Sequence, residues 1–206
     1  MTRSADEAAY ARLLASLPPV AAARLRAAMA EPHRRYHARW HLGRIHRLHA
    51  GHGDRADDAD VALLAAYHDA IYDPAAPLAR NESRSAAALL EDATDLALAP
   101  PRAARLAAII LATADHLGDG AGMTADDPLG AWFLDLDLEP LASPDHAANT
   151  ALIRAEYAHV PDGAFAAGRR AFLARLAAHP RLFRTGAARR LGWEEAARAN
   201  LARDLA

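Results

Sequence analysis

The chain has 206 residues, which is enough to bury a hydrophobic core and suits one domain of ordinary size. Its formal net charge of -2 gives no general attraction to nucleic acid or to an anionic membrane. It contains no cysteine, which excludes disulfides, thiolate ligands and a cysteine nucleophile, and no lysine, which excludes a Schiff base and a Walker-type phosphate lysine.

The first 33 residues predict a helical extension that packs on the domain formed by residues 34–206. Residues 5–17 carry an apolar stripe with helical spacing, and Ser4 is a suitable N-cap. The stripe consists of Ala8, Tyr10, Leu13, Leu14 and Leu17. Pro18 and Pro19 end this helix, and a second helix is expected over residues 20–30. We find no chemistry-bearing pattern in the extension.

The N-terminal sequence MTRSADEAAYARLL carries acids and an arginine, and it lacks the basic-then-apolar pattern of a signal peptide. No apolar run approaches the roughly 20 residues that a membrane-spanning helix needs. We therefore expect a cytoplasmic protein with no membrane partner. A homodimer is left open.

Residues 34–206 predict a series of helices that carry histidines and carboxylates. His37 and His41 lie four residues apart in a helix over 37–50, and His68 and Asp69 are adjacent in a helix over 57–71. Further helices are expected over 81–95, 100–116, from 127 onward through the acids Asp135 and Asp137, then 144–159, 161–180 and 194–205, with a glycine-rich excursion at 118–122. No segment shows sustained alternation between hairpin turns, so the expected fold class is all-α.

Adjacent helical side chains point about 100° apart, so the His68-Asp69 pair needs partners from other segments to form a metal site. The two upstream histidines offer such partners. Downstream, Asp135 and Asp137 lie inside an apolar run, where acids are rare unless they are paired or bind metal. Imidazole and carboxylate ligands suit a divalent ion such as manganese, iron, magnesium, cobalt or zinc.

The order of these motifs, a histidine, a His-Asp pair and a late aspartate, resembles the HD superfamily of metal-dependent phosphohydrolases. The segments RRYHARWHLGRI, YHDAIYDP, NESRSA, IILATADH, FLDLDLEPL and RAEYAHVPDGAF, in this order, are similar to one bacterial branch of predicted HD phosphohydrolases. The resemblance covers Arg34 to the C-terminus. One departure is Ala38, where the Tyr-His-Asn pattern of the branch has asparagine. The resemblance implies a single-domain helical HD-type bundle with a metal site between helices.

By this resemblance, the metal ligands are expected to be His41, His68, Asp69 and Asp137. His37 stays an alternative to His41, because it lies one turn away on the same predicted face. Side chains at i and i+2 of a helix point to opposite sides, so at most one of Asp135 and Asp137 enters the site. The Asp-x-Asp-Leu register of the family favours Asp137, which leaves Asp135 as a supporting or capping acid.

The resemblance also suggests residues for catalysis and for substrate binding. Asp69, Glu82 and His116 are the catalytic candidates, and the last two are alternatively ligands of a second metal. Glu82 is equally an acid that stabilises a helix start. Asp73 is either a general base or, with better support, the first residue of an Asx turn before Pro74.

Substrate contacts are expected from His37, Arg84 and Tyr157. Tyr157 belongs to the segment EYAHVP, which is expected to close the pocket over the substrate. Arginines near the motifs suit bidentate phosphate contacts. They are Arg35, Arg80, Arg84 and Arg154.

The favoured function is hydrolysis of a phosphate ester in a small molecule, a nucleotide or related phosphometabolite, by water activated on a divalent metal. A nucleic-acid substrate is not expected, because the chain is slightly acidic and has no basic stripe. The alternatives are a di-iron HD-type oxygenase of a phosphonate or polyol and a non-catalytic HD protein that senses a ligand. The identity of the metal would separate the hydrolase from the oxygenase.

Overall fold

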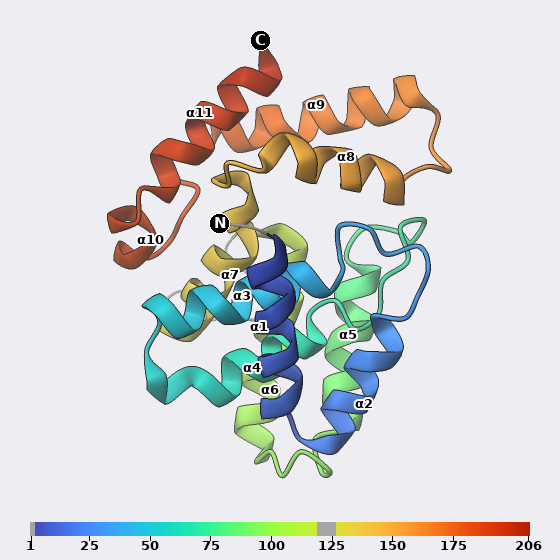
Figure 1. Cartoon of the computed structure of the whole chain (residues 1–206), viewed down its shortest axis with the longest axis vertical. Helices are drawn as coiled ribbons and strands as arrows, with labels where there is room; N and C mark the ends of the chain where they lie inside the picture. The colour runs from blue at the N-terminus through green and yellow to red at the C-terminus, as the bar shows by residue number, and fades with distance from the viewer. Residues whose placement is uncertain (1–2, 119–126) are drawn as a thin grey trace.

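The computed structural model describes residues 3–118 and 127–206, and in this part of the chain all regular structure is helical, which confirms the all-α prediction. The α-helices are α1 (Arg3–Ser16), α2 (Pro19–Ala28), α3 (Arg39–His52), α4 (Asp58–Tyr67), α5 (Arg80–Glu91), α6 (Pro100–Ala112), α7 (Pro128–Leu138), α8 (His146–Glu156), α9 (Asp162–Ala178), α10 (Gly186–Arg190) and α11 (Trp193–Leu205) (Figure 1). Three short 3-10 helices are η1 (Arg55–Asp57), η2 (Thr113–Asp115) and η3 (Glu139–Leu141). Most of the glycine-rich segment at residues 118–122 lies outside the described residues.

Several helix starts follow directly from local sequence. Proline occupies the first helical turn of α2, α6 and α7, where its missing N–H leaves no hydrogen bond unmade. The Asp127 side chain accepts a hydrogen bond from the Gly130 N–H at the start of α7. Ala38 is the N-cap of α3 and has no side-chain acceptor, so the asparagine that the resemblance leads us to expect would be a favourable cap at this position.

Two expectations for α1 are wrong. Ala8 is exposed, and the buried face of α1 instead includes Asp6, Ala9, Tyr10 and Leu13, because Asp6 is paired with arginines of α3. Ser4 lies inside α1, since the helix begins at Arg3.

Two helix boundaries near the site also differ from the prediction. His37 lies before α3, which begins at Arg39, and α4 ends at Tyr67, so the His68-Asp69 pair follows the helix. The short helix α10 was not predicted. The His-Asp pair therefore stands at a helix end, where the chain turns away.

Buried residues from the whole described chain form one hydrophobic core. Leu13 of α1 and Leu25 of α2 lie in it together with Tyr67, Phe133 and Phe183. Helix α1 runs close to α3 at Gly43, where a Cβ atom would lie 1.8 Å from the backbone oxygen of Asp6. This position requires glycine. In Figure 1, α8, α9 and α11 lie together at one end of the molecule, above the helices of the N-terminal half.

A cluster of four charged residues, which we call the arginine cluster, joins α1 to α3 and η3. The Arg44 guanidinium donates two hydrogen bonds to Glu139, one of them 2.7 Å long, and its third nitrogen lies 3.6 Å from Asp6. Arg47 donates a 2.8 Å hydrogen bond to Asp6. Each carboxylate in this cluster therefore faces a guanidinium.

Candidate metal centre

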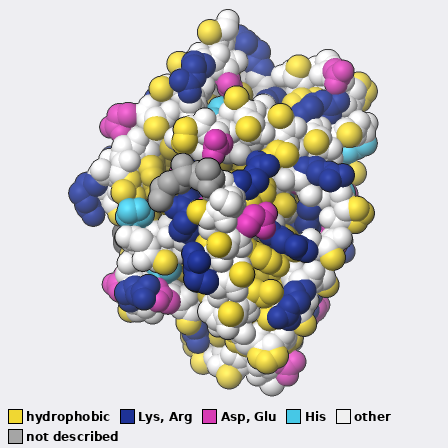
Figure 2. Space-filling view, in the orientation of Figure 1, with side chains coloured by type: hydrophobic (Ala, Val, Ile, Leu, Met, Phe, Trp, Pro, Cys, Tyr) yellow, Lys and Arg dark blue, Asp and Glu magenta, His cyan; other side chains and the backbone are white. Residues whose placement is uncertain are grey.

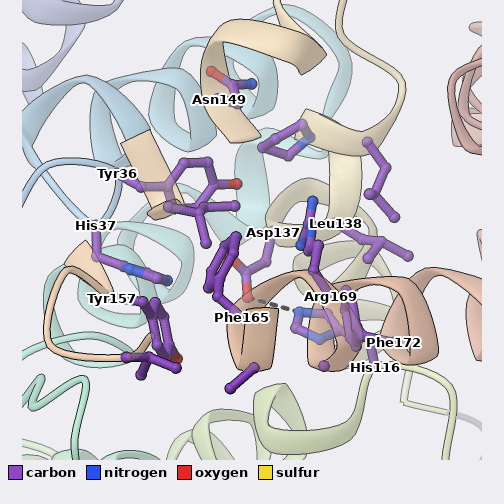
Figure 3. A pocket seen from close by; sticks show the side chains of 16 residues that line it. Tyr36, His37, His116, Asp137, Leu138, Asn149, Tyr157, Phe165, Arg169 and Phe172 are labelled. Atoms are coloured by element: carbon purple, nitrogen blue, oxygen red, sulfur yellow. Dashed lines mark hydrogen bonds and ion pairs between the residues drawn. The ribbon is translucent and has the colours of Figure 1, made fainter. Parts of the chain in front are cut away.

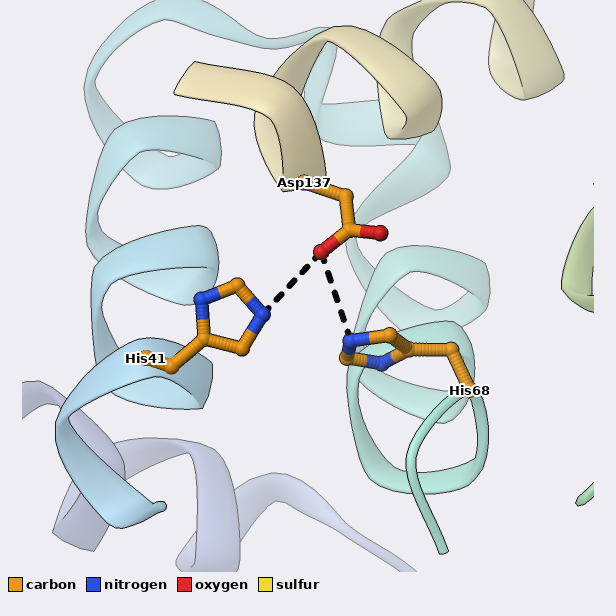
Figure 4. Close-up of side chains that lie close together, drawn as sticks. All are labelled: His41, His68 and Asp137. Carbon is orange, nitrogen blue, oxygen red and sulfur yellow. Dashed lines mark hydrogen bonds and ion pairs between the residues drawn. The ribbon is translucent and has the colours of Figure 1, made fainter. Parts of the chain in front are cut away.

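A second polar cluster, which we call the histidine cluster, lies one turn from Arg44 and consists of His41, His68, Asp69 and Asp137. His41 comes from α3, the His-Asp pair follows α4, and Asp137 stands near the end of α7 (Figure 4). Asp137 Oδ1 lies 3.0 Å from His41 Nε2 and 3.6 Å from His68 Nε2. Asp69 Oδ2 lies 3.1 Å from His68 Nε2 and 3.9 Å from His41 Nε2. Three segments distant in sequence thus bring four potential ligands together.

The buried Arg34 fixes the backbone of the loop that carries Asp69. Arg34 is 6% exposed and donates a 2.8 Å hydrogen bond to the backbone oxygen of Asp69 and a 3.3 Å one to that of Ala70. The His68 ring is held as well, because its Nδ1 lies 3.1 Å from the Leu64 backbone oxygen. A carbonyl only accepts, so a ring proton sits on Nδ1, and in the neutral ring the lone pair of Nε2 faces the carboxylates.

Several buried ligand atoms have no hydrogen-bond partner. They include His68 Nε2 and Asp69 Oδ2, which are only 3.1 Å apart, and His41 Nδ1. A lone pair that faces carboxylate oxygens inside a protein is unfavourable unless a cation stands between them. The cluster therefore requires either an extra proton or a metal ion.

The pKa shifts of the cluster residues also indicate a place that attracts positive charge. Burial would lower the pKa of His68, but the charges of Asp69 and Asp137 outweigh it and hold the pKa well above its usual value. Burial would raise the pKa values of Asp69 and Asp137, but the nearby histidines outweigh it, and both pKa values are lowered. Both carboxylates are thus kept ionised, in a place that attracts positive charge.

His41, His68 and Asp137 together could hold a metal ion, since one ligand atom from each lies within 4.8 Å of the others. Nitrogen and oxygen donors of this kind suit a divalent ion, and the unpartnered atoms of His68 and Asp69 fit its presence.

His116 extends the cluster on its far side. Its Nε2 lies 2.8 Å from Asp137 Oδ2, so Asp137 uses one oxygen toward His41 and His68 and the other toward His116. Asp135 points elsewhere, because its carboxylate accepts hydrogen bonds of 2.6 and 2.8 Å from the backbone N–H groups of Arg184 and Thr185. The two aspartates of α7 therefore face opposite sides.

Beside the cluster is a cavity of about 530 Å³, which we call the pocket (Figure 3). Asp137 and His116 line one side of it, and α8 and α9 supply much of the rest. The lining residues are Tyr36, His37, His116, Asp137, Leu138, Pro140, Leu141, Asn149, Ile153, Tyr157, Val160, Ala164, Phe165, Gly168, Arg169 and Phe172. Two predicted substrate contacts, His37 and Tyr157, are thus pocket residues.

Two further predicted site residues, Glu82 and Arg84, lie on α5. No contact that the structure describes brings either of them to the histidine cluster. Glu82 is half-exposed and Arg84 is exposed, because the buried face of this helix is formed by Ser85, Ala86 and Leu89. Their roles stay predictions. Asp73 forms the expected turn, since its Oδ1 accepts a 2.9 Å hydrogen bond from the Ala75 N–H.

Glu156 is a buried residue in contact with His37 for which no chemical role was predicted. Its Oε1 accepts hydrogen bonds from the backbone N–H groups of residues 35–37, and its Oε2 lies 2.7 Å from His37 Nδ1 and accepts a 2.8 Å bond from the Tyr72 hydroxyl. Burial would raise the pKa of Glu156, but these hydrogen bonds outweigh it and lower the pKa to about 2. The carboxylate holds residues 35–37 out of α3 and orients His37.

Asn149 and Arg169 are pocket residues that sequence reasoning also missed. Nothing marks either one in the sequence, because Arg169 is one of several arginines on an alanine-rich helix and Asn149 stands between Ala148 and Thr150 in no recognisable motif. Only the packing of α8 against η3 and of α9 beside it puts them near Asp137.

Comparison with protein-family models, with curated proteins and with solved structures found no match. What can be said of the site therefore comes from its residues and their geometry. The histidine cluster and the adjoining pocket are the features that carry a functional interpretation.

Proposed function

We propose that the chain is a metal-dependent phosphohydrolase of the HD type, which hydrolyses a phosphate ester in a small molecule. One observation carries the proposal: His68 Nε2 and Asp69 Oδ2 are buried, 3.1 Å apart and without hydrogen-bond partners, beside His41 and Asp137. A bound divalent ion would supply an activated water and positive charge at the phosphoryl oxygens.

The residues of the chain would bind the ion, hold its ligands in place and transfer a proton. His41, His68, Asp69 and Asp137 would hold the ion, and Arg34 and the Leu64 carbonyl keep Asp69 and His68 in place. His116 lines the pocket and contacts Asp137, so it is suited to give a proton to the leaving alkoxide when the ester P–O bond breaks. The water oxygen would form the new P–O bond, and the proton that this water loses would replace the one that His116 gives up.

A small-molecule substrate fits the surroundings of the cluster. The pocket has the volume of a typical small-ligand site. On the face drawn in Figure 2, arginine side chains are scattered and form no continuous basic stripe of the kind that tracks a nucleic-acid backbone. No described helix is both long and apolar enough to cross a membrane.

The test is phosphate release from a panel of nucleotides and sugar phosphates, with manganese, iron, magnesium, cobalt or zinc supplied in turn. His68→Ala should lower the rate by more than about a hundredfold, which exceeds the usual loss for residues that only support a ligand. The matched control is His52→Ala, because His52 is exposed at the end of the same helix as His41. It should leave the rate unchanged.

Two results would contradict the proposal. One is a metal-loaded wild-type protein that releases no phosphate from any member of the panel. The other is tight iron binding with an oxygen-dependent absorption spectrum, which would favour the oxygenase. Equal loss of activity in His52→Ala would show that the assay does not report on the cluster.

A further inference from the structure

The pocket beside the histidine cluster contains open space next to one face of α9. Ala164, Gly168 and Phe172 line the pocket, and because they follow one another at intervals of four residues, they lie on the same side of the helix. A Cβ atom on Gly168 would have no heavy atom within 4 Å outside its own stretch of the helix. The small residues of this face therefore leave room for a ligand.

Apolar side chains form most of the pocket wall. Leu141 of η3, Ile153 of α8 and Phe165 of α9 belong to it, and the Phe165 ring lies 6.0 Å from that of Tyr157. Ile153 and Phe165 are only partly buried, and Phe172 is 39% exposed, although most large apolar side chains of the described chain are buried. An apolar group that covers these side chains would remove their surface from water, which favours binding.

The charged groups of the pocket belong to the side next to the histidine cluster (Figure 3). Asp137 is a member of the cluster, His116 contacts it at 2.8 Å, and the His37 ring centre lies 6.2 Å from that of a cluster histidine. Burial raises the pKa of the Tyr36 hydroxyl, Asp137 raises it further and Arg169 lowers it, so both charges act near this hydroxyl. A phosphoryl group directed to the cluster would leave mainly apolar wall for the rest of the molecule.

We propose that the pocket selects phosphate monoesters of hydrophobic alcohols, with the hydrocarbon group against η3, α8 and α9 and the phosphoryl group toward the histidine cluster. Hydrocarbon loses no hydrogen bonds against apolar walls, whereas sugar hydroxyls and the edges of a nucleobase do. Asn149 compensates little for such a loss, because its Nδ2 is buried. Nucleotides and sugar phosphates would therefore be poor substrates. The inference rests on the proposed phosphohydrolase function and names the substrate class of its site.

The first experiment measures binding without turnover. Alkylphosphonates carry a C–P bond in place of the ester bond, so they are not hydrolysed as phosphate esters are. Calorimetric titration of the protein supplied with divalent ions compares ethyl-, butyl- and hexylphosphonate. Each added methylene should tighten binding by about two- to fourfold, and the heat-capacity change of binding should become more negative along the series. Equal affinity for ethyl- and hexylphosphonate would overturn the inference.

Two glycines of α9 give a matched pair of variants. Gly168→Leu places a side chain in the open space of the pocket, so it should weaken hexylphosphonate binding by about tenfold or more and leave ethylphosphonate within about twofold. Gly163→Leu is the control, because a Cβ atom on Gly163 also meets nothing within 4 Å but Gly163 is not part of the pocket lining. It should bind both ligands as wild type does. A folded Gly168→Leu variant with unchanged hexylphosphonate binding, or with equal losses for both ligands, would overturn the inference.

Thermal unfolding of each variant shows whether it is folded. Ala164→Leu, on the same face of α9, replaces Gly168→Leu if that variant is not folded.

The second experiment compares kcat/KM of the metal-loaded protein for hexyl phosphate, adenosine 5′-monophosphate and ribose 5-phosphate. Hexyl phosphate should exceed the other two by about tenfold or more. Failure of the proposed function looks different: phosphonates would bind with the expected dependence on chain length, but no ester would release phosphate. Phosphate release without a preference for the longer alkyl chain would instead leave the hydrolase and reject the substrate class.

Discussion

The arginine cluster joins α3 to η3, and the histidine cluster joins α3 to the end of α7. Arg44 lies three residues after His41, and Glu139 lies two residues after Asp137, but the two clusters differ in how their charge is balanced. Arg44 donates two hydrogen bonds to Glu139, and Asp6 meets both Arg44 and Arg47. In the histidine cluster, the two ionised carboxylates face imidazoles, whose charge depends on protonation, and His68 Nε2 and Asp69 Oδ2 have no hydrogen-bond partner.

The difference distinguishes buried charge that is already balanced from a cluster that could hold a metal ion. A buried carboxylate paired with a guanidinium carries its own countercharge and needs no ligand. Carboxylates paired with imidazoles need either a protonated ring or a cation from outside. The type of basic residue therefore distinguishes the candidate metal centre from the arginine cluster.

The largest effect is expected when the arginine cluster is broken. Glu139→Gln leaves the Arg44 guanidinium buried without its main countercharge, so the free energy of unfolding should fall by about 3–5 kcal/mol. Urea denaturation measures this change. Metal content should stay at the wild-type level.

The matched control for Glu139→Gln is Asp162→Asn, because Asp162 is 94% exposed in its ion pair with Arg154. An exposed pair of this kind contributes about 0–1 kcal/mol. If the two variants lost similar stability, or if Glu139→Gln lost its metal, the division between the two clusters would be wrong.

A smaller effect is expected at Glu156, a buried carboxylate that is satisfied by donors and needs no cation. Its pKa is lowered from 4.5 to about 2, so its contribution is complete above pH 4.5 and is lost as the pH falls toward 2. The shift corresponds to about 3 kcal/mol. Glu156→Gln should remove this part of the acid dependence of unfolding.

The measurement is denaturant unfolding of wild type and Glu156→Gln between pH 7 and pH 2.5. The stability difference between them should shrink as the pH falls. A difference that stays constant over this range would mean that Glu156 acts by packing and not through its charge.

Much of the fold could be predicted from local signals. The prolines and Asp127 mark helix starts, and the helical spacing of apolar residues marks most of the helices that form. The start of α3 could not be predicted, because it depends on Glu156, which lies about 120 residues away and binds the backbone of residues 35–37. Long-range contacts of this kind leave no mark in local sequence.

Only part of the candidate site could be predicted. The family resemblance led us to expect His41, His68, Asp69 and Asp137, which the structure brings together, and the i, i+2 spacing predicted that Asp135 and Asp137 face different sides, as they do. Glu82 was expected near the cluster because of its motif alone. Arg169 could not be distinguished from Arg170 in the sequence, since only the rotation of α9 makes one line the pocket and the other face solvent.

The most direct test of the difference between the clusters is the metal content of protein purified without chelator and then supplied with divalent ions, measured by mass spectrometry. Wild type and Glu139→Gln should hold a near-stoichiometric ion, and His68→Ala and Asp137→Asn should hold none. A wild-type protein that holds no ion, or a His68→Ala variant that holds as much as wild type, would contradict the assignment of the histidine cluster as a metal centre.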